Sequence, residues 1–177
     1  MAEKTANATT RSDAPRGRQQ RSSRRDERRN KRDRDDAPKE FEEVVINIDR
    51  VARVVKGGRR FRFKALVVVG NRKDKVGVGV AKGQDVQTAI SKATDVAKKN
   101  LIIIPLYKDT IPHDSETRIS GAHVLIKPAA PGTGIIAGGV IRQIIGVTGI
   151  RNMLSKSLGS TNKVNIAYAT IKALSSL

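Results

Sequence analysis

The chain has 177 residues, with 35 lysines and arginines against 17 aspartates and glutamates, and a formal net charge of +18. A charge of this size favours nucleic acid or another anionic surface as the partner, while the absence of cysteine excludes disulfides, thiolate chemistry and cysteine-ligated zinc. No apolar stretch reaches the roughly 18 residues that a membrane span needs, so we expect no membrane partner.

Residues 1–40 are predicted to form a disordered, charged arm. They contain 13 Lys/Arg and 8 Asp/Glu and almost no large apolar residue, so they cannot bury enough surface to offset chain entropy. The run RGRQQRSSRRDERRNKRDR either contacts an RNA backbone or is a solvated tail, and both interpretations stay open.

Three strands with short links are expected after the arm. VVINIDRVARVV (44–55) is rich in β-branched residues, and the two glycines of VKGGRR (55–60) predict a turn. RFRFKALVVV (60–69) alternates over its first half, with apolar residues on one face and cations on the other. After a polar turn, VGVGVAK (76–82) completes an antiparallel meander.

A helix is expected to cover the apolar face of this sheet. Asp85 is a suitable N-cap, and apolar residues follow it at helical spacing. They are Val86, Ala89, Ile90, Ala93, Val96 and Ala97. The helix would leave the Arg/Lys face of the sheet outward, so residues 41–104 are predicted to form a β-β-β-α domain.

Residues 105–177 are predicted to form a second domain of β-α-β type, which makes the fold class α+β. A first strand is expected at LIIIP (101–105), which begins this part of the chain and crosses the boundary at residue 105. Two further strands are expected at HVLIKP (123–128) and at RNMLSKSLG (151–159). IIAGGVIRQIIG (135–146) is typical of a helix, and GSTN (159–162) precedes another.

Each of the two helices has an expected inward face. The first should turn Ile136, Val140 and Ile144 inward, and its Gly138 and Gly139 should allow close packing, since glycine inside a helix costs about 1 kcal/mol relative to alanine. The inward face of the second should contain Val164, Ala167, Tyr168, Ile171 and Leu174.

The densest positive charge outside the arm lies between Arg50 and Lys64, where seven cations occur without an acid. If strand 76–82 pairs in the register we expect, Gly77 and Gly79 lie beside Arg62 and Lys64 and allow an RNA backbone to approach the sheet. A solvated face is the alternative, and we favour RNA because the charge has a single sign. The turn around Lys56 is equally consistent with an RNA-binding loop and a plain flexible hairpin.

The mode of RNA recognition follows from the scarcity of aromatic residues. The whole set is Phe41, Phe61, Phe63, Tyr107 and Tyr168. Proteins that bind single strands stack bases on several rings, so recognition of duplex or shape through phosphates is favoured. The residues assigned to RNA binding are Arg50, Arg53, Lys56, Gly57, Gly58, Arg59, Arg60, Arg62, Lys64, Arg72, Lys75, Gly77, Gly79, Lys82, Lys127, Thr133, Ser160, Thr161 and Asn162.

No catalytic or metal site is predicted. The two histidines, His113 and His123, lie ten residues apart without further His or Cys, whereas a metal site needs three or four ligands. The acids Asp109, Asp114 and Glu116 could bind a cation, but a solvated loop is the favoured interpretation. No nucleophile occurs beside a base in a recognisable setting.

The glycine-rich stretch PAAPGTGIIAGG (128–139) raises the possibility of a nucleotide site. It lacks the lysine of a Walker loop and the downstream acid of a dinucleotide fold. Its opening is similar to the P-x-x-x-G-x-G of a family of sugar and mevalonate kinases, but Ile135 and Ile136 stand where those enzymes have paired serines. We therefore expect no enzyme, no cofactor and no small-molecule substrate.

Four strings in order carry a resemblance to a known family: VKGGRRFRFKALVVVGNRKDKVGVGVAKG, A-x-x-K-A-x-x-x-A-K-K-N, GTGIIAGG and LGSTN. Over about residues 41–177, the chain resembles ribosomal protein five of the bacterial small subunit. The resemblance implies an N-terminal domain similar to a double-stranded-RNA-binding fold. It also implies a C-terminal domain that shares its fold with the sugar and mevalonate kinases.

The resemblance also implies a function and partners. Members of the family bind small-subunit ribosomal RNA in the cytoplasmic ribosome, near the channel where messenger RNA enters and beside ribosomal proteins four and eight, and they influence decoding accuracy. Val55, Lys56, Gly57, Gly58 and Arg59 match a loop that lies by the spectinomycin-binding RNA helix. Gly134 and Arg142 match positions near the contact with protein four.

Two other functions remain to be separated from this one. A free-standing double-stranded-RNA-binding regulator would use the same basic sheet, and a small-molecule kinase would use the second domain. Stoichiometric sedimentation with small subunits distinguishes the ribosomal protein from the regulator, and ATP binding would indicate the kinase.

Overall fold

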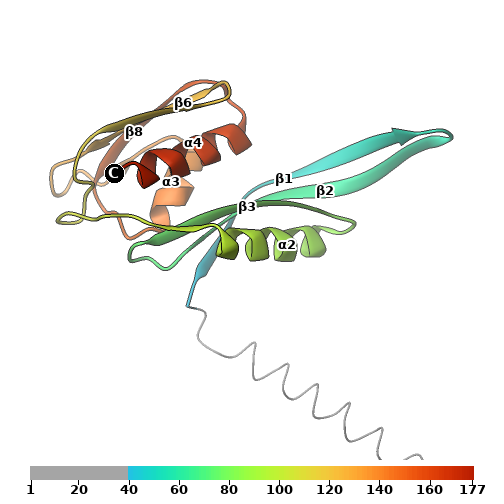
Figure 1. Cartoon of the computed structure of the whole chain (residues 1–177), viewed down its shortest axis with the longest axis horizontal. Coiled ribbons are helices and arrows are strands. Elements are labelled where there is room, and N and C mark those ends of the chain that lie inside the picture. The colour runs from blue at the N-terminus through green and yellow to red at the C-terminus, as the bar shows by residue number, and fades with distance from the viewer. Residues whose placement is uncertain (1–39) are drawn as a thin grey trace, which may run out of the picture. The chain divides into compact units, whose positions relative to one another are not determined.

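Two four-stranded sheets form the framework of residues 40–177, the part of the chain that the computed structural model describes (Figure 1). The arm predicted for residues 1–40 lies outside the described residues, apart from its last one. Within residues 40–177, no helix is long and apolar enough to cross a membrane.

The first sheet confirms the predicted antiparallel meander. Its strands are β1 (Glu42–Val55), β2 (Gly58–Gly70), β3 (Lys75–Gly83) and β4 (Leu101–Ile103), in the order β1-β2-β3-β4. The strand at LIIIP is expected at the start of the second domain, but the structure places it in the first sheet as β4, which pairs with β3. The distal parts of β1 and β2 continue past the end of β3 as a two-stranded hairpin (Figure 1).

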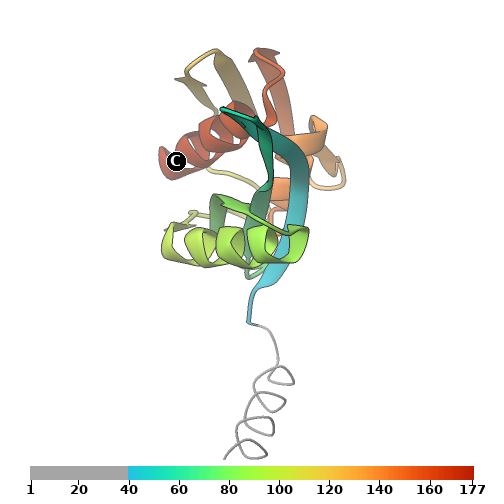
Figure 2. The same cartoon turned by 90° about the vertical axis from the view of Figure 1, so that its right-hand side faces the viewer.

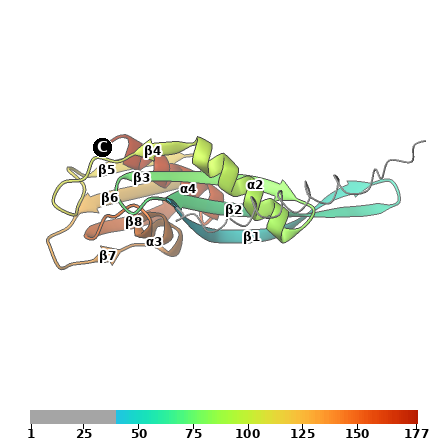
Figure 3. The same cartoon turned by 90° about the horizontal axis from the view of Figure 1, so that it is seen from below.

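Helix α2 (Val86–Lys99) covers one face of the first sheet, as expected (Figure 3). It begins after Asp85, whose backbone N–H donates to Thr88 Oγ1 at 3.2 Å. Its small residues Ala89, Ala93 and Ala97 are fully buried and form a core with the inward residues of β2. Residues this small allow the helix to lie close to the strands.

The opposite face of the sheet is covered only in part: its distal Arg/Lys part is exposed, as predicted, but its proximal part is buried. Leu66 and Val68 of β2 are buried against helices α3 (Gly139–Gly146) and α4 (Lys163–Ser175) in a second core. In Figure 2, α2 lies on one side of the first sheet and the C-terminal half on the other. The run ALVVV of β2 is apolar on both faces because both faces are covered.

The second sheet confirms the β-α-β character of the C-terminal half. Its strands are β5 (Ser115–Ile119), β6 (Ala122–Pro128), β7 (Ile135–Ile136) and β8 (Met153–Gly159), in the order β5-β6-β8-β7. β7 runs parallel to β8, so β7, α3 and β8 form a β-α-β unit, and the other pairs are antiparallel.

The helix predicted at 135–146 begins later than expected. Residues 135 and 136 form a short strand, and Ile136 is 54% exposed instead of buried. Gly138 is the N-cap and Gly139 the first residue of α3, and a Cβ on either would meet nothing within 4 Å. Close packing therefore does not require these two glycines.

The last helix follows the prediction with one residue misplaced. Asn162 is its N-cap, and Ala167 and Leu174 are buried as expected. Tyr168 is 39% exposed, because the buried stripe passes through Ala169 and Thr170 instead. The boundary proposed between residues 104 and 105 stays a prediction, since residues from both sides of it contribute to one hydrophobic core.

Candidate nucleic-acid interface

One face of the β1–β2 hairpin gathers unpaired cations. The register places Arg53 opposite Arg60, Val51 opposite Arg62 and Lys64 opposite Lys82. Residues opposite each other share a face of an antiparallel sheet, so the cations of β1, β2 and β3 project the same way. Together, Arg53, Arg60, Arg62 and Lys82, called here the basic face, line a concavity of about 250 Å³.

The basic face lacks internal compensation for its charge. All four side chains are exposed, and no carboxylate of residues 40–177 lies within 4.0 Å of any of them. Arg53 and Arg60 stand directly opposite, and like charges in that position destabilise a sheet. A phosphate group in the concavity would relieve this repulsion, so the arrangement fits a polyanion.

Two cations assigned to RNA binding are already engaged in ion pairs. Lys64 Nζ lies 2.8 Å from Asp49 Oδ2 across the strand pair, and Asn47 donates to the same carboxylate at 2.6 Å. The hydrogen bond from Lys64 holds the pKa of Asp49 below its ordinary value, although burial acts in the opposite direction. Lys64 therefore contributes less free charge than its neighbours on the strand.

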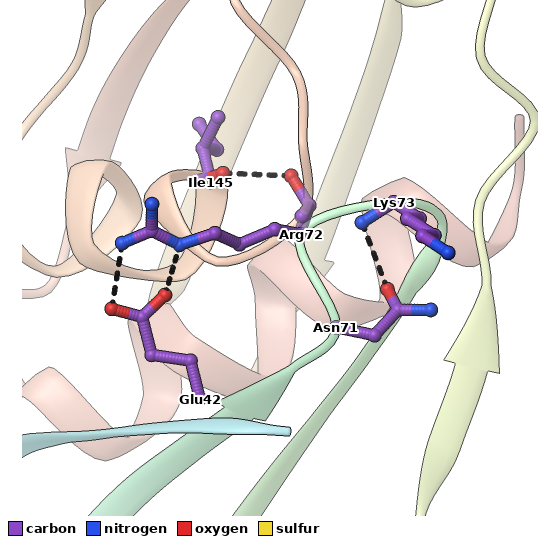
Figure 4. Close-up of polar contacts among 6 residues, drawn as sticks. Glu42, Asn71, Arg72, Lys73 and Ile145 are labelled. Atoms are coloured by element: carbon purple, nitrogen blue, oxygen red, sulfur yellow. Dashed lines mark hydrogen bonds and ion pairs between the residues drawn. The ribbon is translucent and has the colours of Figure 1, made fainter. Parts of the chain in front are cut away.

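Arg72 is the second of these engaged cations (Figure 4). Its guanidinium donates through Nη2 to Glu42 Oε1 at 2.8 Å and through Nε to Glu42 Oε2. The hydrogen bond lowers the pKa of Glu42 and raises that of Arg72. The backbone N–H of Arg72 donates to Val147 O at 2.9 Å, so this residue joins the β2–β3 turn to the C-terminal half.

The tip of the hairpin is the turn predicted from VKGGRR. Gly57 and Gly58 have φ of +94° and +146°, a region that glycine adopts at little cost. A Cβ on either would meet nothing within 4 Å, so the turn needs glycine for its backbone conformation and not for space. Lys56 and Arg59 flank the turn and are exposed.

The role predicted for Gly77 and Gly79 is wrong. Gly77 pairs with Val69 and Gly79 with Val67, so neither lies beside Arg62 or Lys64. A Cβ on Gly79 would lie 2.0 Å from Ala93 O, and one on Gly77 would lie 2.3 Å from Ala97 O. These glycines admit the backbone of α2, and the helix excludes RNA from them.

The remaining residues assigned to RNA binding lie elsewhere. Lys75 is half-buried at the start of β3, whereas Lys127 and Thr133 are exposed in the C-terminal half. Ser160 and Asn162 serve the start of α4, because Ser160 Oγ accepts from the Asn162 N–H and Asn162 Oδ1 accepts from the Val164 N–H, both at 3.1 Å. Thr161 is exposed between them. None of these residues lines the concavity of the basic face.

The glycine-rich loop is held by a side chain that sequence reasoning missed. Asn152 is 8% exposed, and its Oδ1 accepts from the backbone N–H groups of Gly132 and Gly134, both at 3.1 Å. These are N–H groups that a phosphate would need in a nucleotide cradle. Gly132 and Gly134 have φ of +91° and +74°, which explains the glycines by conformation. The only available signal was an asparagine at the start of the strand predicted at 151–159.

The structure locates three other residues named in the sequence analysis but suggests no further function for them. Gly134 is half-buried, and Arg142 is exposed on α3. His123 contacts Glu116 across the β5–β6 pair. Within residues 40–177, no group of three or more His, Asp or Glu side chains could hold a metal ion.

Comparison with known proteins identifies the family that the sequence resembles. The family model described as ribosomal protein S5, N-terminal domain, matches residues 41–105, and that of ribosomal protein S5, C-terminal domain, matches residues 117–177. The small ribosomal subunit protein uS5 of one Campylobacter jejuni strain is 54% identical over 138 residues, which cover 78% of this chain and 94% of the relative. The uS5 proteins of two further strains of the same species give the same figures.

Proposed function

The chain belongs to the ribosomal protein S5 family, and from this premise we propose that it is a structural constituent of the small ribosomal subunit that binds ribosomal RNA through the basic face. The observation that carries the proposal is the convergence of Arg53, Arg60, Arg62 and Lys82 on one concavity, with no carboxylate of residues 40–177 within 4.0 Å of them. Cations on a hydrogen-bonded hairpin are already positioned, so they lose less entropy on meeting phosphates than cations on a mobile segment do.

The two ion pairs separate the cations that stabilise the fold from the cations that are available to bind RNA. Lys64 and Arg72 are paired with Asp49 and Glu42 of β1, so their charge stabilises the first sheet. Arg53, Arg60 and Arg62, which lie nearer the tip of the hairpin, form no ion pair with another residue of 40–177. The hairpin therefore presents its free charge beyond the covered part of the sheet, where a large RNA can reach it (Figure 1).

Finer parts of the proposal follow the family resemblance. We place the protein in the cytoplasmic ribosome, near the channel where messenger RNA enters, with ribosomal proteins four and eight as neighbours and a contribution to decoding accuracy shared with protein four. The hairpin tip at Val55, Lys56, Gly57 and Gly58 would lie near the spectinomycin-binding RNA helix. The exposed side chain of Arg142 and the neighbouring loop at Gly134 would contact protein four.

A salt titration tests the RNA interface. The triple variant Arg53→Gln, Arg60→Gln, Arg62→Gln should bind a small-subunit ribosomal RNA transcript more weakly, and the slope of log affinity against log salt should fall by roughly one for each phosphate that the variant no longer binds. The matched control is Lys92→Gln, Lys99→Gln, Lys172→Gln, which removes three exposed cations from α2 and α4. Equal slopes in the two variants would contradict the assignment.

Sedimentation separates the ribosomal protein from a free-standing regulator. The protein proposed here should travel in equal amount with small subunits through a sucrose gradient. A persistent free pool at normal expression would favour the regulator.

A further inference from the structure

The reverse face of the hairpin differs in chemistry from the basic face. Its opposed pairs are Arg50 with Phe63, Ala52 with Phe61 and Val54 with Arg59. Phe63 packs into the core under α2, but Phe61 is 49% exposed and Val54 is 75% exposed. Neither Phe61 nor Val54 belongs to either hydrophobic core, so the fold does not require an aromatic ring at position 61.

The ring of Phe61 carries an ordered cation. The guanidinium carbon of Arg50 lies 3.9 Å from the ring centroid, in the range of a cation–π contact. No carboxylate of residues 40–177 lies within 4.0 Å of this guanidinium. The result is a contacting pair of planar groups in which Phe61 is about half exposed, flanked by Arg59 on the next opposed pair of the strands.

Planar groups of this kind bind unstacked nucleobases. Bases that leave a helix stack on aromatic rings and on Arg guanidinium planes, and the surrounding cations hold the backbone of the same strand. On the face of Phe61 the register places two cations, Arg50 and Arg59. A single ring framed by cations matches one base of an RNA better than it matches an apolar surface of a partner protein.

We propose that Phe61 and Arg50 form a stacking site for one unpaired nucleobase. This inference rests on the proposed RNA-binding function and adds to it. The basic face binds backbone phosphates, and the reverse face holds a base displaced from the adjoining helix. RNA recognition by the hairpin thus includes an unpaired nucleotide in addition to the duplex phosphates that composition favoured.

The experiment uses the full chain and two RNA hairpins that differ by one nucleotide. One hairpin contains a single bulged 2-aminopurine, and the other is fully paired. In the protein, Phe61→Leu keeps an apolar side chain but removes the ring, whereas Phe61→Tyr keeps the ring. Since base–aromatic stacking contributes strongly to the binding of each base, Phe61→Leu should weaken binding of the bulged hairpin about 5- to 100-fold. Phe61→Tyr should stay within about twofold of the wild type, because the same ring can stack.

Two further readouts keep the outcome specific. The fluorescence of the bulged 2-aminopurine should be quenched by the wild type and by Phe61→Tyr but much less by Phe61→Leu. Both hairpins have the same closing loop, so binding of the hairpin with the fully paired stem should change by less than about twofold in both variants, since its stem offers no unpaired base. Thermal unfolding of each variant verifies that the hairpin of the protein is intact.

Contrary results have distinct meanings. Equal affinities of Phe61→Leu and wild type for the bulged hairpin would overturn the stacking site. A Phe61→Leu protein that binds both RNAs normally but no longer joins small subunits would assign this face to a protein partner, which also overturns it. The proposed phosphate interface is judged separately by the salt slope of the Arg53, Arg60 and Arg62 variant. Failure of one proposal therefore does not imply failure of the other.

Discussion

The substitution Gly79→Ala tests whether the glycines of β3 serve helix packing or RNA access. The added Cβ would lie 2.0 Å from Ala93 O and 2.6 Å from the backbone nitrogen of Ala97. Both atoms belong to the backbone of α2, so no side-chain rotation can relieve the overlap. Because carbon needs roughly 3.5 Å from such neighbours, the helix must move away from the sheet by about 1 Å or more.

The cost follows from the core that this movement disturbs. Overpacking a well-packed interior costs typically about 1–3 kcal/mol, and α2 packs through the fully buried alanines at 89, 93 and 97, which have no flexible atoms to yield. We therefore expect a loss near the upper end, about 3 kcal/mol. For a unit of this size, that loss lowers the unfolding temperature by roughly 10 °C.

Urea denaturation of the two proteins measures the effect, and Gly139→Ala provides the control. A Cβ at Gly139 would meet nothing within 4 Å, and its φ is not positive, so alanine there should be neutral or stabilise by up to about 1 kcal/mol. RNA affinity of Gly79→Ala, measured where the protein is folded, should equal that of the wild type. A variant as stable as the control would refute the packing argument, and a stable variant with weakened RNA binding would restore the access hypothesis.

Two smaller changes probe single interactions. Asp49→Asn should release Lys64 for phosphate binding and steepen the slope of log affinity against log salt by up to about one. The slope is measured by titration with the same RNA transcript. An unchanged slope would show that Lys64 does not reach the RNA. Because Lys64 lowers the pKa of Asp49 in the folded state, this carboxylate stabilises the fold at pH values above its ordinary pKa, and the contribution is lost as the pH falls through the lower folded pKa. Acid titration of wild type and variant should therefore converge at low pH. Asn152→Ala should destabilise the protein by about 1–3 kcal/mol, since the N–H groups of Gly132 and Gly134 lose their acceptor. Hydrogen exchange should accelerate at these two amides. Unchanged protection there would contradict the role given to Asn152.

The sequence predicted the elements well wherever one local signal decided them. The alternation in β2, the GG turn, the Asp85 cap, the helix that follows GSTN and the strands β6 and β8 agree with the structure. The errors occurred where two signals competed. Ile135 and Ile136 continue an apolar run into α3, but they form a strand because they pair with Met153 and Leu154 of β8.

The sequence could predict which segment contains the candidate site, but not which of its side chains share a surface. Charge density correctly singled out residues 50–64 as the most basic part outside the arm. The division of its cations between two faces depends on the register of β1 with β2, since Arg50 and Arg59 lie on one face and Arg53, Arg60 and Arg62 on the other. The engagement of Lys64 and Arg72 in ion pairs depends on acids outside that segment, which approach them only after folding.

The sequence by itself therefore determined the family, the local elements and the sign of the charge, because each is written in consecutive residues. Only the tertiary structure decided which side chains and backbone groups remain accessible to a partner. It placed α2 over Gly77 and Gly79, buried Leu66 and Val68 of β2 in a core with residues of α3 and α4, and satisfied the glycine-rich loop with Asn152. These outcomes arise from interactions between residues distant along the chain, and their distances follow from packing, which no local pattern encodes.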